Sequence, residues 1–170
     1  MSRQETVTLT NMVMIEDENG KILVEDKVDP HWKGISFPGG HLLPNESIVH
    51  SAIREVKEET GLDIKDLKLV GVNNNVSPNF NRYLVFLFKT KTFSGELKSS
   101  EEGKVFWVEK KNLKNYKLTP EFSDLIEIFY NDSINENYAV WNDNGEVTDH
   151  LLEIIGLIQS NTTFLVNIDL

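Results

Sequence analysis

The sequence predicts a single α+β domain built around a mixed β-sheet, and three observations support this prediction. Short β-rich segments come before, between and after two amphipathic helical segments, an order typical of mixed folds. The length of 170 residues corresponds to about one domain. With 39% apolar and 26% charged residues, the chain has a globular composition and is too apolar to be disordered.

The predicted strands are identified by their content of β-branched and aromatic residues. They span residues 6–15, 21–24, 35–37, 67–72, 82–92 and 104–109. Asn19-Gly20, between the first two segments, predicts a hairpin turn. The apolar run within residues 82–92 predicts a strand buried on both faces, whereas the Asn-rich residues 73–79 predict a loop.

Two helices are predicted from apolar residues at helical spacing. The first spans residues 46–59, with Pro44-Asn45 as its start signal and Gly61 as its C-terminal stop. We expect one of its faces to be buried, namely Ile48, Val49, Ala52, Ile53 and Val56. The second spans residues 121–130 and presents Phe122, Leu125, Ile126 and Phe129.

The charge distribution excludes a generic basic nucleic-acid-binding protein. The chain has 17 Lys and Arg against 27 Asp and Glu, which gives a net charge of −10. Residues 118–170 contain ten acidic residues and no Lys or Arg. We therefore expect an acidic C-terminal surface that disfavours long nucleic acids and leaves small metal-bound nucleotides as ligands. The absence of cysteine excludes disulfides, thiol nucleophiles and Cys-ligated zinc.

We expect no export signal and no membrane-spanning segment. The first eleven residues lack an apolar core, and the uncharged stretch 154–168 is interrupted by polar residues and shorter than a spanning helix. This stretch predicts a helix end, a turn and a short buried strand at 163–168, or a subunit contact in a homodimer. A cytoplasmic location is expected.

Three glutamates on the first predicted helix form the strongest candidate for chemistry. Glu55, Glu58 and Glu59 stand at i, i+3 and i+4, so they share one helix face, beside the apolar stripe. Glutamates in this pattern usually form a solvated face. Here Gly39-Gly40 precede the helix and permit close approach to a ligand, and Arg54 lies beside the acids. Oxygen ligands without His or Cys suit Mg²⁺, with Mn²⁺ as the alternative.

The segment from Gly40 to Leu62 resembles the Nudix box. That box has a glycine, five residues, a glutamate, seven residues, and then an Arg-Glu-aliphatic-any-Glu-Glu-any-Gly-aliphatic run. Its fixed positions are matched by Gly40, Glu46, Arg54, Glu55, Val56, Glu58, Glu59, Gly61 and Leu62. The resemblance implies an α/β/α sandwich with a central mixed sheet. Residues 1–170 would form one such domain, with 132–170 as an acidic extension packed on it or at a subunit contact.

The resemblance also implies roles for individual residues. Metal ligands would be the carboxylates of Glu55, Glu58 and Glu59 and the Gly39 carbonyl, with Arg54 and Glu46 orienting them and Gly40, Glu46 and Gly61 shaping the box. Family members often use a later glutamate as a ligand or base, and we favour Glu101 over its neighbour Glu102 for this role. The alternative for both is a solvated loop.

The box identifies the reaction rather than the substrate. The chain is similar to bacterial MutT-type, and especially MutX-like, 8-oxo-dGTP diphosphatases, which implies hydrolysis of a nucleoside triphosphate to a monophosphate and pyrophosphate. The candidates for contacting the nucleotide are Trp32, Gly40, Phe80, Arg82 and Tyr83. Pro78, sixteen residues beyond the box, supports the alternative of ADP-ribose hydrolysis, and a dinucleoside polyphosphate is a further alternative. A non-catalytic nucleotide-sensing module is disfavoured because no acid of the box is missing.

Overall fold

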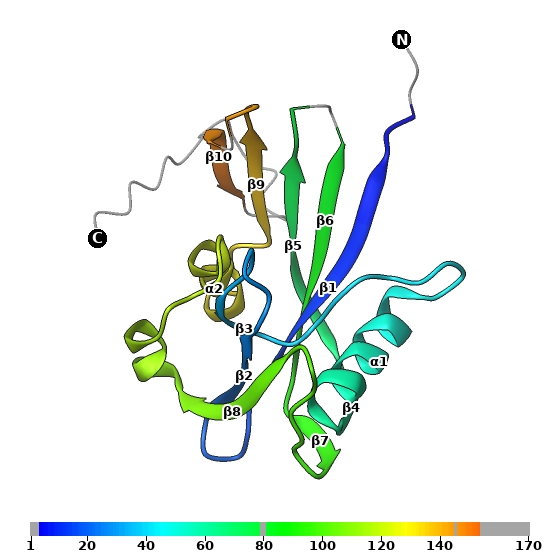
Figure 1. Ribbon diagram of the computed structural model, residues 1–170, viewed down its shortest axis with the longest axis vertical. Coiled ribbons are helices and arrows are strands. Elements are labelled where there is room, and N and C mark those ends of the chain that lie inside the picture. The colour runs from blue at the N-terminus through cyan, green and yellow to red at the C-terminus, as the bar shows by residue number, and fades with distance from the viewer. Residues whose placement is uncertain (1–3, 79–80, 145, 154–170) are drawn as a thin grey trace.

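The computed structural model describes residues 4–78, 81–144 and 146–153 (Figure 1). Its strands within these residues are β1 (Val7–Ile15), β2 (Lys21–Lys27), β3 (Gly34–Ser36), β4 (Leu62–Lys65), β5 (Lys68–Val76), β6 (Arg82–Thr90), β7 (Thr92–Gly95), β8 (Gly103–Glu109), β9 (Glu136–Trp141) and β10 (Val147–Glu153). The helices are α1 (Ile48–Thr60), the short 3₁₀ helix η1 (Lys110–Asn115) and α2 (Phe122–Tyr130).

The main sheet is mixed and has the strand order β1-β6-β5-β9-β10. β1 runs parallel to β6 and β5 runs parallel to β9, whereas the β5–β6 and β9–β10 pairs are antiparallel. A second sheet has the order β3-β2-β8, and β4 pairs with β7. The mixed sheet confirms the predicted fold class, and β6 is the interior strand that its apolar run predicts.

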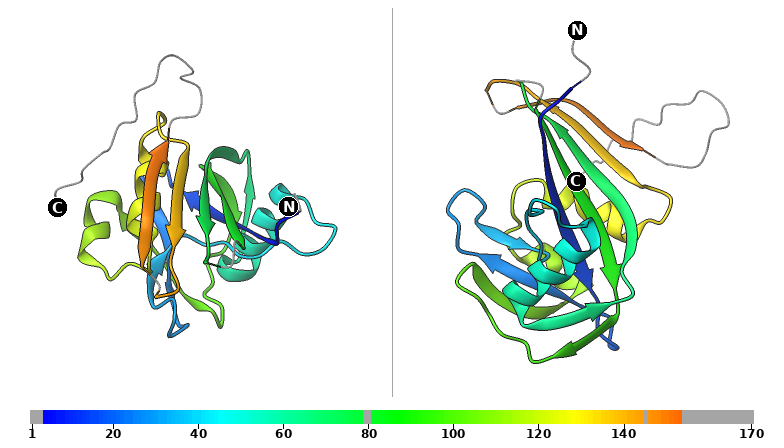
Figure 2. Two further views of the ribbon diagram at one scale, coloured as in Figure 1. Left: turned by 90° about the horizontal axis from the view of Figure 1, so that it is seen from above. Right: turned by 90° about the vertical axis from the view of Figure 1, so that its right-hand side faces the viewer.

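Two apolar clusters hold the layers together, one on each side of β1. Val13 and Ile15 pack with Ala52 and Val56 of α1. Met14 points the other way, into the cluster that contains α2, because successive side chains of a strand alternate between its faces. Figure 2 shows the strands between the two helices. This arrangement confirms the predicted α/β/α sandwich.

Helix α1 begins two residues later than its sequence predicts. Ser47 is the N-cap, and its hydroxyl oxygen accepts a hydrogen bond from the His50 amide at 3.1 Å. Glu46 therefore precedes the helix and is free to reach back to it. The expected stripe is also wrong at Val49, which is 46% exposed, whereas Ser51 and Glu59 occupy the buried face. Gly61 ends the helix in the left-handed conformation, as expected.

Two local predictions between the strands need correction. The turn at Gly20 is present, but β1 and β2 then diverge into different sheets, so they form only the start of a hairpin. Asn73–Val76, predicted as a loop, continue β5. The Asn73 side chain accepts a hydrogen bond from the buried Asn137 amide at 2.8 Å, a long-range partner that offsets the low strand propensity of asparagine.

The part of the C-terminal region that the structure describes extends the main sheet. β9 pairs with the edge of β5, and β10 pairs with β9. The strand and subunit contact expected within residues 154–168 lie outside the described residues. No helix in the described part of the chain is long and apolar enough to cross a membrane.

Candidate active site

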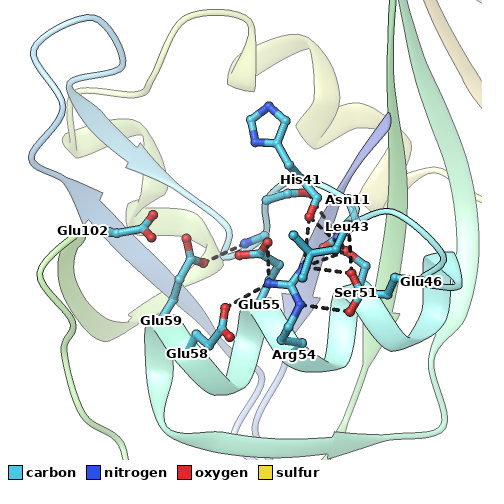
Figure 3. A network of polar contacts seen from close by, with 12 residues as sticks. Asn11, His41, Leu43, Glu46, Ser51, Arg54, Glu55, Glu58, Glu59 and Glu102 are labelled. Carbon is cyan, nitrogen blue, oxygen red and sulfur yellow. Dashed lines mark hydrogen bonds and ion pairs between the residues drawn. The ribbon is translucent and has the colours of Figure 1, made fainter. Parts of the chain in front are cut away.

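The box acids are organised by Arg54, which lies on α1 at the centre of a polar network (Figure 3). Its guanidinium donates to both oxygens of Glu46 at 2.9 Å, a bidentate pair. The same guanidinium donates to Glu55 and Glu58 at 2.9 Å each and to the His41 carbonyl at 3.0 Å. The hydrogen bonds from Arg54 lower the pKa of Glu46 to about 2. Arg54 thus ties the loop before the helix to the helix face.

Glu55 lies against Gly40, and this contact explains the need for glycine there. A Cβ atom at Gly40 would lie 2.6 Å from the Glu55 carboxyl carbon, so any side chain would displace the carboxylate. The Glu55 side chain is 12% exposed. Burial raises the pKa of Glu55, and the Arg54 guanidinium partly offsets this effect.

Glu59 is the most buried of the three helix acids. One of its oxygens accepts a hydrogen bond from the Gly39 amide at 2.8 Å, and the other accepts one from the Lys27 ammonium at 2.6 Å. Burial raises the pKa of Glu59, the Lys27 ammonium opposes this shift, and the charge of Glu25 adds to it. Sequence reasoning missed both Lys27 and Glu25, which lie two residues apart on the same face of β2 and belong to no recognisable motif.

The oxygen donors present fit a hard divalent cation, although they are not gathered around one point. Among the described residues, no three acidic or histidine side chains converge closely enough to hold a metal ion as they stand. Each box carboxylate instead faces a cation of the protein, Arg54 for Glu55 and Glu58 and Lys27 for Glu59. The three carboxylates therefore lie on one helix face, and each is paired with a positively charged side chain. Carboxylate oxygens are ligands that suit Mg²⁺ or Mn²⁺.

The Gly39 carbonyl, an expected metal ligand, lies between two carbonyls that pair with β1. The carbonyls on either side of it, of Pro38 and Gly40, accept hydrogen bonds from the β1 amides of Val13 and Asn11. Within the described residues, the Gly39 carbonyl accepts none. Gly39 has a φ of 149°, and a Cβ there would meet the Asn11 backbone, so glycine is required for this close approach.

Glu102, the neighbour of the favoured Glu101, contacts a residue beside the box, and the role expected of Glu101 stays a prediction. The Glu102 carboxylate lies 4.0 Å from the Lys27 ammonium, and Figure 3 shows it pointing toward Glu59. Its backbone carbonyl accepts a hydrogen bond from the Val28 amide at 3.0 Å, which fixes this turn immediately before β8. Glu101 also lines the adjoining cavity, so both remain within its walls.

A cavity of about 950 Å³ adjoins the box. Its floor is one face of the main sheet, since Thr10, Val85 and Asn73 stand opposite one another on neighbouring strands. Gly39, Gly40 and Lys27 line it on the side of the box. The volume is within the range of small-molecule sites, which is roughly 300–1,000 Å³.

The structure separates the five expected nucleotide contacts into three groups. Trp32, Gly40 and Tyr83 line the cavity, and Trp32 is 49% exposed there. The side chain of Arg82 is held by Glu5 and Asn74 at 3.0 and 2.6 Å, and Arg82 is not among the lining residues. Phe80 lies outside the described residues.

Sequence reasoning missed a polar group on the far side of the cavity from the box. Glu121 lines the cavity in the left-handed conformation, with a φ of 64°, immediately before α2, and its side chain does not cap that helix. It accepts a hydrogen bond from Asn75 at 2.6 Å instead, and burial raises its pKa. Trp141, at the end of β9, lines the cavity as well. A backbone strained without local benefit is typical of a functional position, but no sequence pattern signals it.

The family of the chain follows from comparison with known proteins. The family model described as NUDIX domain matches residues 8–128. The uncharacterized Nudix hydrolase YvcI of Bacillus subtilis is 31% identical over 117 residues, which cover 66% of this chain and 72% of YvcI. The chain spans about half of a second relative, the ADP-ribose pyrophosphatase of Methanocaldococcus jannaschii, at 30% identity over 54% of each protein.

A shorter match and a solved structure complete the comparison. The putative 8-oxo-dGTP diphosphatase YtkD of Bacillus subtilis is 46% identical over 52 residues, 31% of each chain. The crystal structure of the MutT protein from Bacillus halodurans superposes with a TM-score of 0.69 at 22% identity and covers 86% of this chain and 97% of its own. Because the family model covers most of the chain, the protein belongs to the NUDIX family of hydrolases, which act on phosphoanhydride bonds.

Proposed function

We propose that the protein is a divalent-metal-dependent nucleotide pyrophosphohydrolase. Its substrate would be a purine nucleoside triphosphate, with 8-oxo-dGTP as the leading candidate, and its products a nucleoside monophosphate and pyrophosphate. The observation that carries the proposal is the complete set of Glu55, Glu58 and Glu59 on one face of α1, beside the Gly39–Gly40 backbone and a nucleotide-sized cavity.

In this proposal Glu55, Glu58, Glu59 and the Gly39 carbonyl hold Mg²⁺ or Mn²⁺, with Glu102 or Glu101 nearby. When bound, the metal neutralises phosphate oxygens and lowers the pKa of a coordinated water. Arg54 keeps Glu55 and Glu58 on one side of the helix through its 2.9 Å contacts. Hydrolysis would leave the water oxygen on the phosphorus that it attacks and the bridging oxygen on the departing phosphoryl group, while the proton lost from the water passes to solvent; the products are a monophosphate and pyrophosphate.

The charges lining the cavity suggest how the substrate is oriented. Lys27 stands on the box side, where the phosphates would lie. Glu121 and Asn75 stand across the sheet from the box, and a half-buried carboxylate there repels phosphate and accepts N–H groups. We therefore propose that the base lies toward Glu121, with Trp32, Tyr83 and Trp141 as its aromatic neighbours.

A second substrate class has support from a relative. The Methanocaldococcus jannaschii protein is named an ADP-ribose pyrophosphatase, so ADP-ribose is the main alternative. A dinucleoside polyphosphate has the same linkage. A cytoplasmic role in removing oxidised nucleotides would follow only if 8-oxo-dGTP is preferred.

The test compares hydrolysis of 8-oxo-dGTP, dGTP, ADP-ribose and diadenosine polyphosphates with Mg²⁺, for the wild type and for Glu58→Gln. Glu58 is 59% exposed, so we expect the substitution to leave the fold intact. We expect it to lower kcat at least about 100-fold, equivalent to about 2.7 kcal/mol at 1.36 kcal/mol per tenfold. Glu96→Gln, which changes an exposed glutamate outside the box and outside the cavity wall, is the matched control.

Two outcomes of this screen contradict the proposal. Undiminished hydrolysis by Glu58→Gln would show that the metal site is assigned to the wrong residues. Equal turnover of dGTP and 8-oxo-dGTP would exclude a role in removing oxidised nucleotides while leaving the hydrolase assignment in place.

A further inference from the structure

A lysine ammonium lies among three carboxylates at the edge of the box. The Lys27 nitrogen is 2.5 Å from Glu25, 2.6 Å from Glu59 and 4.0 Å from Glu102. Lys27 is only 17% exposed, and Glu25 and Glu59 are almost fully buried. Burying charges is costly even when they are paired, so such a cluster needs a reason beyond stability.

Glu25 is the unusual member, because it does not belong to the box. On β2 it lies on the same face as Leu23, whose side chain packs in the apolar cluster with α1. Glu25 is fully buried beneath Gly103, where a Cβ would lie 2.7 Å from the Glu25 Cγ. Its Oε1 atom is buried without a hydrogen-bond partner within the described residues. Its carboxylate contacts the Lys27 ammonium, so Lys27 is the cation that faces this buried charge.

Lys27 faces both Glu59 and the cavity. It is the last residue of β2, and its ammonium contacts the Glu59 oxygen that does not accept from the Gly39 amide. In the proposed function that carboxylate is a metal ligand. The ammonium and a divalent cation would therefore compete for the same oxygen, and the protein would need a second position for the displaced ammonium.

We propose that Lys27 is a built-in counter-ion that occupies Glu59 in the metal-free protein and competes with the divalent metal for it. Glu25 is the positioning residue that keeps the ammonium beside the site after the metal takes Glu59. This inference rests on the proposed function, because it takes Glu59 as a metal ligand. According to this inference, Lys27 and Glu25 of β2 affect the metal affinity together with the glutamates of the box.

The experiment measures Mn²⁺ binding, by electron paramagnetic resonance of the free ion, and thermal unfolding with and without Mn²⁺. Lys27→Met removes the competitor, so we expect Mn²⁺ to bind at least about fivefold more tightly. The metal-free variant should melt at a lower temperature, because Glu25 and Glu59 lose their counter-ion, and Mn²⁺ should raise its Tm by more than it raises that of the wild type. Glu25→Gln removes the second carboxylate that holds the Lys27 ammonium, so Lys27 should compete more strongly for Glu59. We therefore expect this variant to bind Mn²⁺ several-fold more weakly.

The matched control is Lys110→Met. Lys110 makes an equally short ion pair, 2.6 Å from Glu16, and neither residue lines the cavity. This variant changes the net charge by the same amount, so a general charge effect would tighten Mn²⁺ binding in it as well. We expect its Mn²⁺ affinity and its metal-induced rise in Tm to match those of the wild type.

The results separate this inference from the proposed function. If the wild type binds Mn²⁺ and Lys27→Met binds it equally or less tightly, the counter-ion role is wrong and the metal site stands. If the wild type binds no Mn²⁺, both are wrong. Should Lys27→Met fail to fold without metal, the double variant Glu25→Gln/Lys27→Met removes both buried charges and must still bind Mn²⁺ more tightly than Glu25→Gln alone.

Discussion

Replacing Gly40 by alanine should inactivate the protein while leaving its fold intact. A Cβ at Gly40 would lie 2.6 Å from the carboxyl carbon of Glu55, whereas ordinary van der Waals contact begins at 3.4 Å. The carboxylate must therefore retreat by about 0.8 Å, away from its position beside Arg54. A displacement of about 1 Å in a catalytic group can cost about 100-fold in rate, so we expect kcat to fall by about that factor.

The stability of Gly40→Ala should change by less than about 1 kcal/mol. The obstructing atoms belong to the end of a flexible side chain, which can move at low cost. The backbone of Gly40 does not have a positive φ, so alanine is tolerated there and restricts the unfolded chain slightly. The assays are kcat on the best substrate, the Mn²⁺ dissociation constant and the free energy of unfolding in urea.

Gly20→Ala provides the opposite pattern as a control. Gly20 has a φ of 76° in the turn before β2, and its nearest obstruction to a Cβ is 4.0 Å away. Alanine there should cost about 1–2 kcal/mol of stability through backbone strain and leave kcat unchanged. A Gly40→Ala protein with kcat within threefold of the wild type would refute the argument that Glu55 must occupy this position.

Two further predictions concern the cavity and the buried acid. Trp141→Ala should raise KM about tenfold, because loss of an aromatic side chain that stacks on the base costs about 1–3 kcal/mol. Trp107 packs on Phe93 outside the cavity, so the control Trp107→Phe should leave KM unchanged. Burial raises the pKa of Glu59 above its ordinary value of 4.5, with Lys27 opposing the shift, so this group stabilises the metal-free protein at low pH and the stability declines as the pH rises above 4.5. Urea unfolding between pH 5 and 9 should show the decline, and Glu59→Gln should flatten it; a wild-type profile without slope would contradict the assignment.

The box could be predicted because its interactions are local in sequence. Arg54, Glu55 and Glu58 lie within one helical turn, and helical periodicity alone places them on one face. The first residue of the helix is harder to predict, because Pro44-Asn45 and Ser47 are both helix start signals. Only the hydrogen bond to the His50 amide shows that Ser47 is the cap.

The cavity could not be predicted because it depends on contacts between distant segments. Asn73 and Asn137 are 64 residues apart, and their hydrogen bond helps to join β5 to β9. An asparagine run favours a loop until such partners are known. The same holds for Glu121 and Asn75, which are 46 residues apart. Periodicity reports which face of an element is buried, but not which polar residue of another element will meet it.

The acidic C-terminal third bears on the site in a way that net charge alone does not reveal. Glu121 accepts from Asn75, and Glu136 accepts from Asn74 at 2.8 Å, so both carboxylates hold β5 in place. Both positions belong to the region that contains ten acids and no basic residue. A lysine or arginine near Glu121 would pair with its carboxylate and would attract phosphate to that side of the cavity. This region has no basic residue. Among the described residues, the lysine or arginine that lines the cavity is therefore Lys27, beside the box. Its position favours binding of the substrate with its phosphates toward the box.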